Sequence, residues 1–447
     1  MNKNKLIFAI IWWIILLFII FLVFSMKKSW DSNTNTNKWD FNIWIIWDDK
    51  TDFSHFIDDF KNIKTEYKNT KINVETFSDY EEYSYALSSS IIANSAPDIF
   101  VLNNNEKNTI FKNQVLWLNP EVFNPNDFRK KYKSVFTDDL IETYLDWEKE
   151  KEALYWIPVW YETLGIYYNL RYVKDSDISY LSWLNSVISK LKKQKPNFTP
   201  IWIWNWSTVY GASDIITQFF LLENGVNSIE DLVWTKLKEP LWTYLFYWDE
   251  NWDNSYNSNF VELKTLWNDN LDLFSKWEIY MAVWYPRMIN EIDKNWYSKN
   301  LLRASPFPHY FSWEWKTLLN YNYFVINKGT SNYNLWEDFL LYLSSEMWSR
   351  NYLNKFPYYL PSLLSLESDK LEEKIHGDYK VVLKDFYNND YLLSSFDKWI
   401  KNIYDRDIIS ILDNSTNYET AFLKFRDKIL CKTKKVFSLE ELSKNCN

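Results

Sequence analysis

The chain begins with an apolar run that a water-soluble domain does not require. Nineteen residues, Leu6 to Phe24, carry no charge, and a helix of about 20 apolar residues spans the hydrocarbon core of a bilayer. A cleavable signal peptide usually has a shorter apolar region followed by small residues, whereas this run closes in Phe24, Ser25, Met26 and two lysines. The run predicts an uncleaved single-pass anchor over residues 1–28, with a long signal peptide as the alternative.

The flanks of the anchor say little about its orientation. Two lysines precede the run and Lys27 and Lys28 follow it. Because the positive charge is similar at both ends, the positive-inside rule gives only weak evidence for which end faces the cytoplasm. The cysteines lie far from the run, which excludes a lipid-modified N-terminal cysteine. Residues 29–38 are polar and of low complexity, and such a composition predicts a spacer between the membrane and a folded part.

Both cysteines, Cys431 and Cys446, lie in the last segment of the chain. In an oxidising compartment this pair predicts a disulfide that holds the tail, with two free thiols as the alternative. Two cysteines and three widely spaced histidines supply too few ligands for a metal site. The sequence therefore predicts no metal site and no cofactor.

Tryptophan is unusually abundant in this chain and glycine is unusually rare. The chain has 27 Trp and 5 Gly, and the two together come to about 7% of the residues, which is the usual share of glycine alone. Trp252 and Trp296 lie in polar, turn-like contexts (D-E-N-W-D-N-S and D-K-N-W-Y-S) where glycine suits the backbone. We interpret most printed Trp as glycine, encoded by UGA in a variant genetic code. The alternative is a carbohydrate-binding surface with many real indole rings.

The folded part opens with alternating strand and helix patterns. Residues 41–47 are predicted as a buried strand, residues 53–63 as an amphipathic helix, residues 71–76 as a strand, residues 80–94 as a helix and residues 98–102 as a strand. This alternation predicts an α/β lobe with a mainly parallel sheet. Further strands are predicted at residues 279–284 and 322–327, with helices dominating elsewhere. A chain of 447 residues is too long to fold around one ordinary hydrophobic core.

Several motifs resemble the extracellular solute-binding proteins of ABC importers, in the large family that includes binders of maltose and other oligosaccharides. The motifs are P-D-I at Pro97 to Ile99, Y-W-I-P-V-W-Y-E-T-L-G-I-Y-Y-N at Tyr155 to Asn169, and F-S-K-W-E-I-Y-M-A-V-W-Y-P-R at Phe274 to Arg287. The family often has glycine where Trp156, Trp160, Trp277 and Trp284 stand. The resemblance covers residues 41 to about 366, and the tail beyond Ser368 has no assigned role.

This resemblance implies a two-lobed, periplasmic-binding-protein-like fold of type II with a hinge, preceded by the transmembrane helix. The N-terminal α/β lobe would hold residues 39–160 with a return segment at about 285–330. The C-terminal lobe and tail would hold residues 161–284 and about 331–447. Such a protein closes two lobes on its ligand about the hinge, so that binding shifts the population from open to closed.

The resemblance also implies where the ligand is bound, because aromatic rings cover sugar faces and short polar groups bind hydroxyls. Carried over by position, the candidate ligand-binding residues are Asp48, Asp49, Tyr80, Tyr83, Asn103, Asn104, Tyr161, Glu162, Asn205, Tyr210, Tyr285, Arg287, Tyr358 and Tyr359. For each of them the alternative is an ordinary packing or surface residue.

The expected function is therefore delivery of a small solute, an oligosaccharide by family habit, to the membrane subunits of an ABC importer. The protein would stand on the extracytoplasmic side of the cell membrane, held in the bilayer by residues 6–24. A net charge of -9 argues against a nucleic-acid partner. No catalytic motif is present, so no enzyme is expected; a surface carbohydrate-acting hydrolase or an adhesin is the alternative.

Overall fold

The computed structural model describes part of the chain: residues 40–46, 50–77, 80–106, 113–146, 149–195, 199–202, 212–222, 273–274, 276, 278–287, 301–309, 317–367 and 392–394. The described chain falls into two compact units, residues 1–85 and 86–447. The predicted anchor and the predicted spacer lie outside the described residues. Within the described part, no helix is long and apolar enough to cross a membrane.

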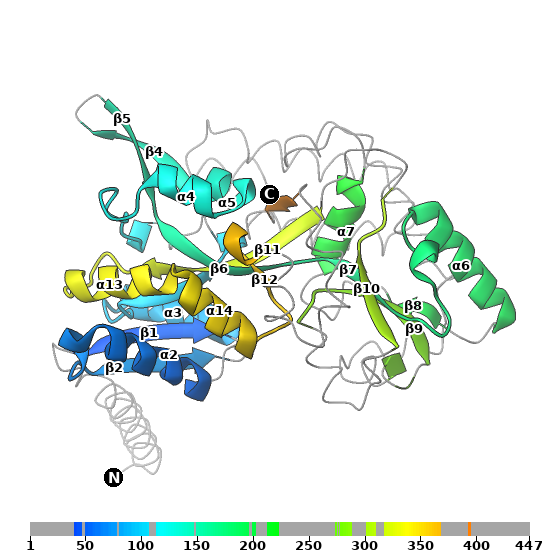
Figure 1. The fold of residues 1–447 in the computed structure, drawn as a ribbon, viewed down its shortest axis with the longest axis horizontal. Coiled ribbons are helices and arrows are strands. Elements are labelled where there is room, and N and C mark those ends of the chain that lie inside the picture. Colours follow the sequence, from blue (N-terminus) through cyan, green and yellow to red (C-terminus); the bar gives the residue numbers. More distant parts are fainter. Residues whose placement is uncertain are drawn as a thin grey trace, which may run out of the picture. The chain divides into compact units, whose positions relative to one another are not determined.

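The first unit is a β-α-β arrangement (Figure 1). Strands β1 (Phe41–Ile46) and β2 (Ile72–Phe77) pair in parallel, and α2 (Lys50–Ile63) connects them. Helix α2 buries Phe53, Phe56, Ile57 and Phe60, a spacing of three and four residues that places all four on one face. These three elements confirm the periodicities found in the sequence. Helix α3 (Tyr80–Ile92), also predicted, runs on into the second unit.

The second unit contains two larger sheets. In the first, β12 (Leu360–Pro361), β6 (Trp156–Thr163), β11 (Thr317–Ile326) and β3 (Ile99–Asn103) are neighbours in that order, and β13 (Leu392–Ser394) also pairs with β11. Every residue of β3, β6 and β11 is buried. Strand β11 runs antiparallel to both β3 and β6, so the mainly parallel arrangement predicted from the sequence holds for β1 and β2 but not for these strands. The predicted strand at residues 322–327 is confirmed, but β11 begins earlier, at Thr317.

The second sheet has the order β10 (Leu302–Pro306), β7 (Gly165–Asn169), β9 (Ile279–Trp284) and β8 (Thr199–Trp202). Strand β9 has the bounds predicted from the sequence. Helices α6 (Leu181–Gln194) and α7 (Ala212–Leu221) belong to this part of the chain, and α6 turns Leu181, Leu184, Ile188 and Leu191 inward. Both helices flank the second sheet in Figure 1.

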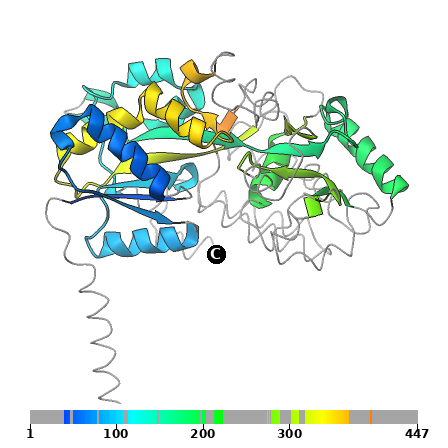
Figure 2. The same ribbon diagram turned by 60° about the horizontal axis from the view of Figure 1, so that its bottom comes forward.

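The chain passes from the first sheet to the second within two strands. Residues 155–169, which form one of the family-like motifs, are divided in the structure into β6 and β7, with Leu164 alone between them. Strand β6 pairs with β11 and β12, whereas β7 pairs with β9 and β10. Figure 2 shows this passage from a second direction. Strand β11 resumes the first sheet after β10, so the chain changes sheets twice.

Smaller elements surround the first sheet. Helices α4 (Pro125–Lys131) and α5 (Ser134–Leu140) precede the hairpin formed by β4 (Ile141–Asp146) and β5 (Lys149–Leu154). Helices α13 (Tyr333–Leu343) and α14 (Glu346–Lys355) follow β11. The short 3-10 turn η2 (Asn104–Glu106) follows β3, and a second short 3-10 turn, η6 (Leu364–Leu366), follows β12.

Candidate functional site

The end of β6 carries a buried acid. Glu162 is 1% exposed, and its Oε1 lies 3.2 Å from Nη1 of Arg287, which follows β9. The backbone N–H of Arg287 also donates to the Glu162 carboxylate. Because β6 belongs to the first sheet and β9 to the second, this ion pair joins the two sheets.

A second acid lies beside this pair. Asp214 in the first turn of α7 is 3% exposed and accepts a hydrogen bond of 2.8 Å from the Tyr285 hydroxyl. One turn further along α7, the Gln218 side chain accepts a 2.8 Å bond from the backbone N–H of Leu318. Helix α7 is therefore tied to the segment after β9 and to the start of β11.

Burial changes the titration of this site. It raises the pKa of Glu162 to about 7; Arg287 opposes that rise and the Asp214 carboxylate adds to it. Burial also raises the pKa of Tyr167 and of Tyr285 well above the usual value. Both phenols are therefore neutral hydroxyls at physiological pH, while Glu162 changes charge near neutrality.

Three buried polar atoms here have no hydrogen-bond partner among the described residues. They are Oε2 of Glu162, the hydroxyl of Tyr167 on β7 and Oδ1 of Asn320 on β11. Asn320 is the registered partner of Glu162 across β6 and β11, so the two side chains leave the sheet on the same face. A buried polar atom without a partner costs about 1–3 kcal/mol, a cost that a bound solute would remove.

We call this set the junction cluster: Glu162, Tyr167, Asp214, Tyr285, Arg287 and Asn320. It includes three of the residues predicted from the sequence, Glu162, Tyr285 and Arg287. The other three went unrecognised. Asp214 has a sequence signal, an acid at the start of an otherwise apolar helix, and so has Asn320, a polar residue inside a buried strand. Tyr167 has no such signal, because a tyrosine in a strand normally packs.

Tyr161 precedes Glu162 and engages a different group of residues. Its hydroxyl lies 3.5 Å from Oε1 of Glu367, and the Lys133 ammonium lies 5.9 Å from the centre of its ring. Lys133 and Glu367 are themselves 2.7 Å apart. Alternation along a strand sends neighbouring side chains to opposite faces, which separates Tyr161 from the junction cluster.

Asn103 and Asn104 connect β3 and η2 to β11. The Asn103 amide donates to Oδ1 of Asn322 at 3.0 Å. The Asn104 amide donates to the carbonyl of Leu319 at 3.1 Å and accepts from the backbone N–H of Tyr321 at 3.3 Å. The two asparagines therefore have a structural role, whatever else they bind.

Four predicted tyrosines take part in aromatic packing. Tyr80 and Tyr83 are buried in α3, and Tyr83 meets Phe77 edge to face at 5.1 Å. Tyr359 stacks on Trp160 with ring centres 3.6 Å apart, and Tyr358 lies beside Tyr359 at 4.6 Å. The remaining candidates, Asp48, Asp49, Asn205 and Tyr210, and the predicted disulfide of Cys431 and Cys446, lie outside the described residues.

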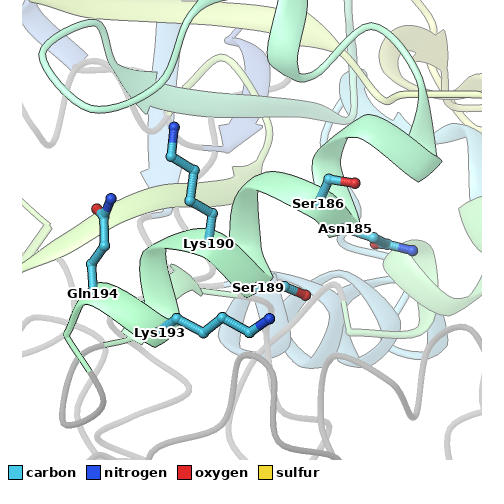
Figure 3. Close-up of a pocket in the computed structure, with 6 residues that line it drawn as sticks. All are labelled: Asn185, Ser186, Ser189, Lys190, Lys193 and Gln194. Atoms are coloured by element: carbon cyan, nitrogen blue, oxygen red, sulfur yellow. The ribbon is translucent and has the colours of Figure 1, made fainter.

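In the described part of the chain, two surface hollows are lined by residues outside the junction cluster. One of about 580 Å³ runs along α6, where Figure 3 shows six lining side chains: Asn185, Ser186, Ser189, Lys190, Lys193 and Gln194. The other, of about 660 Å³, lies between the β4–β5 hairpin and the turn before α4. Lining by a single helix gives the α6 hollow no convergent groups, so it is a weaker candidate than the junction cluster. The described residues also contain no group of three or more potential metal-binding side chains.

A family model decides what kind of protein carries this cluster. The model of the bacterial extracellular solute-binding proteins matches residues 47–348, more than half of the chain. The chain belongs to this family. A comparison of the sequence with curated proteins finds no match. The members of this family are binding proteins and not enzymes.

Solved structures of solute-binding proteins show the same two-lobed α/β fold. The sugar-binding protein MalE from Xanthomonas citri is similar with a TM-score of 0.68 and 14% identity, over 89% of this chain and 99% of that one. An ABC substrate-binding protein from Listeria monocytogenes, solved with cycloalternan, gives a TM-score of 0.66 and 13% identity over 88% and 98% of the two chains. A cyclic alpha-maltosyl-1,6-maltose binding protein from Arthrobacter globiformis gives 0.66 and 13% over 86% and 96%.

Proposed function

We propose that this solute-binding protein captures an oligosaccharide outside the cytoplasm and delivers it to the membrane subunits of an ABC importer. The observation that carries the proposal is the junction cluster. Groups from both sheets of the second unit converge there, and three of its buried polar atoms have no hydrogen-bond partner among the described residues. Sugar hydroxyls supply such partners. The names of the similar structures, which refer to cycloalternan, to a sugar-binding protein and to cyclic alpha-maltosyl-1,6-maltose, support the same ligand class.

In this proposal β6 and β7 form the hinge, and closure on the solute completes the site. The N-terminal lobe holds residues 39–160 and the return segment at about 285–330, and the C-terminal lobe holds the rest of the folded part. All the ligand-binding candidates named from the sequence remain part of the proposal, and the contacts of Glu162, Tyr285 and Arg287 support these three in particular. Because the solute binds the closed arrangement of the lobes more tightly than the open one, binding shifts the population from open to closed.

Residues 6–24 anchor the protein in the bilayer, and residues 29–38 hold the folded part away from the membrane. Because the family is extracellular, its members support a folded part on the outer side of the membrane. Fractionation of native cells checks the anchor: the protein should stay in the membrane pellet after a high-salt wash and leave it with detergent. Release by salt alone would contradict the proposed span.

We also propose that most printed Trp are glycine in the native protein. Trp156 and Trp336 are buried, and the indole N–H of each has no hydrogen-bond partner in the described part of the chain. Buried indole N–H groups usually find an acceptor, so two that do not are better explained by glycine. The tail disulfide between Cys431 and Cys446 is retained as part of the proposed extracytoplasmic form.

A thermal-shift screen of the full-length protein in detergent tests the transport function. A solute that binds only the folded state raises the melting temperature as its concentration increases. We expect at least one neutral oligosaccharide to do so, without release of shorter products. Hydrolysis of the sugar would instead favour an enzyme, and the absence of a shift with every sugar and small solute would contradict the proposal.

A further inference from the structure

The chain has two short basic runs whose surroundings differ. In the first, residues 129–133, three cations form ion pairs: Arg129 with Glu152, Lys130 with Asp127 and Lys133 with Glu367. The second, residues 190–195, has four lysines in six residues and lies at the end of α6. The last of these, Lys195, contacts a hydroxyl and not an acid, since its Nζ donates to Tyr280 at 2.9 Å.

Helix α6 has a charge opposite to that of the chain. It carries three lysines and no Asp or Glu, whereas the whole chain has a net charge of -9. The other described helices of eight or more residues each contain at least one acid. A helix C-terminus favours cations in its last turn, but Lys190 precedes that turn. The charge of α6 therefore calls for a further explanation.

Two of these lysines lie on the outer face of α6. Ser186, Lys190 and Lys193 recur at intervals of four and three residues, which places them on one face, opposite the four buried apolar residues of the helix. All three are exposed. Figure 3 shows both lysine side chains extended away from the helix, along the hollow that they help to line. This face therefore presents ammonium groups and hydroxyls to its surroundings.

The bilayer is an anionic surface that the proposed anchor keeps within reach. Residues 25–40 separate the apolar run from β1, and a segment of that length spans at most roughly 55 Å when fully extended. Tethering of this kind raises the effective concentration of headgroups around the folded part. Each lysine close to an anionic bilayer strengthens binding about fivefold, so a few lysines are enough to favour one orientation.

We infer that the outer face of α6 docks on anionic lipid headgroups, with the ammonium groups of Lys190 and Lys193 against the lipid phosphates. Docking orients the folded part on the outer leaflet while it delivers its solute. This inference rests on the proposed function, from which it takes the membrane anchor, and it adds a second contact between the protein and the bilayer.

Flotation with vesicles tests the docking. The full-length protein is first inserted through its anchor into nanodiscs of phosphatidylcholine, so that only the folded part can bind a second membrane. We expect the nanodiscs to float with added phosphatidylglycerol vesicles and not with phosphatidylcholine vesicles. At about 1 M salt, where the Debye length is about 3 Å, the association should be lost. Equal recovery with both vesicles, or recovery with neither, would overturn the inference. The thermal-shift screen with sugars tests the transport function separately, because it requires no vesicle.

Two double variants that remove the same charge locate the contact. Lys190→Gln with Lys193→Gln should weaken binding to phosphatidylglycerol vesicles about 25-fold, that is, about fivefold for each lysine. Lys130→Gln with Lys131→Gln, at the exposed end of α4, should weaken it less than about twofold. Equal losses in the two double variants would show that net charge and not α6 governs binding, and would refute the contact. Binding of poly-glutamate without binding of vesicles would assign this face to an acidic protein and would equally refute membrane docking.

Discussion

Glu162 and Arg287 form an ion pair of 3.2 Å between the end of β6 and the segment after β9. Glu162 lies in the first sheet, whereas Arg287 follows a strand of the second sheet and is far away in the sequence, so the pair links the parts of the chain on either side of Leu164. The acid is buried while the guanidinium is partly exposed. A guanidinium stays protonated in proteins, so Glu162 is the member of the pair that titrates, and its burial makes the stability of the fold depend on pH.

The free energy of unfolding should fall as pH rises from about 4.5 to about 7. Burial raises the pKa of Glu162 from its ordinary value of 4.5 to about 7. In this window the folded chain holds a proton that the unfolded chain has lost, so the stabilisation is complete below pH 4.5 and is lost as pH approaches 7. The contribution is of the order of 3 kcal/mol.

Urea unfolding across this pH range, compared between wild type and Glu162→Gln, isolates the effect. The variant cannot titrate at this position, so its stability should change less between pH 4.5 and 7. Asp127→Asn on the exposed face of α4 serves as the control and should follow the wild-type profile. Parallel profiles of wild type and Glu162→Gln would show that the acid is ionised throughout.

The side-chain amide of Asn104 links η2 to β11. It donates to the carbonyl of Leu319 and accepts from the N–H of Tyr321, so Asn104→Leu removes both of these hydrogen bonds to buried backbone groups. We expect a loss of about 2–3 kcal/mol in the free energy of unfolding, measured by urea titration. Asn126→Leu, at an exposed site, is the comparison variant. A loss no larger than that of the comparison variant would mean that water replaces both bonds.

The sequence predicts the elements well where periodicity is strong. Strands β1, β2, β3 and β9 and helix α2 follow from alternating or helical apolar patterns, and the structure has them within a few residues of the expected bounds. The division of residues 155–169 into two strands was not predictable in this way. Both halves are buried and apolar, so nothing in the local pattern marks Leu164 as the point where the pairing partners change.

The candidate site was predictable only through motifs. Glu162, Tyr285 and Arg287 stand in segments that resemble the family, and the structure brings them together. Asp214 joins them through the Tyr285 hydroxyl, a contact set by the packing of α7 against β11 and the segment after β9. Asn320 acquires its place from the register of β6 and β11. Register and helix packing are long-range properties, and one sequence does not display them.

The Lys133–Glu367 ion pair joins the residue before α5 to the residue after η6, and removing one partner of this pair should destabilise the fold. Its atoms are 2.7 Å apart, and the side chains are 9% and 18% exposed. Lys133→Met leaves a largely buried carboxylate without its cation, so we expect a loss of about 2–3 kcal/mol in the free energy of unfolding. The double variant with Glu367→Gln should recover part of that loss, because no buried charge remains.

A double-mutant cycle by urea unfolding measures this coupling. The Lys130–Asp127 pair on α4 is the matched comparison, since its atoms lie 2.9 Å apart but its side chains are 75% and 61% exposed. Water screens such a pair, so no measurable coupling is expected there. If the coupling energy between Lys133 and Glu367 is as weak as that between Lys130 and Asp127, solvent enters between Lys133 and Glu367.

The intact mass of the protein purified from its native cells should be lower than the mass of the printed sequence. Each UGA codon translated as glycine replaces an indole side chain by a hydrogen, and with 27 printed Trp the total difference is large. The protein must come from its own cells, because a foreign host would apply its own code. Peptide sequencing should show glycine at Trp252 and Trp296, where the surrounding residues favour a turn. It should also show glycine at Trp156 and Trp336, whose buried indole N–H groups have no acceptor in the described chain. A mass equal to that of the printed sequence would restore every indole, including that of Trp160, which stacks on Tyr359 in the buried interior.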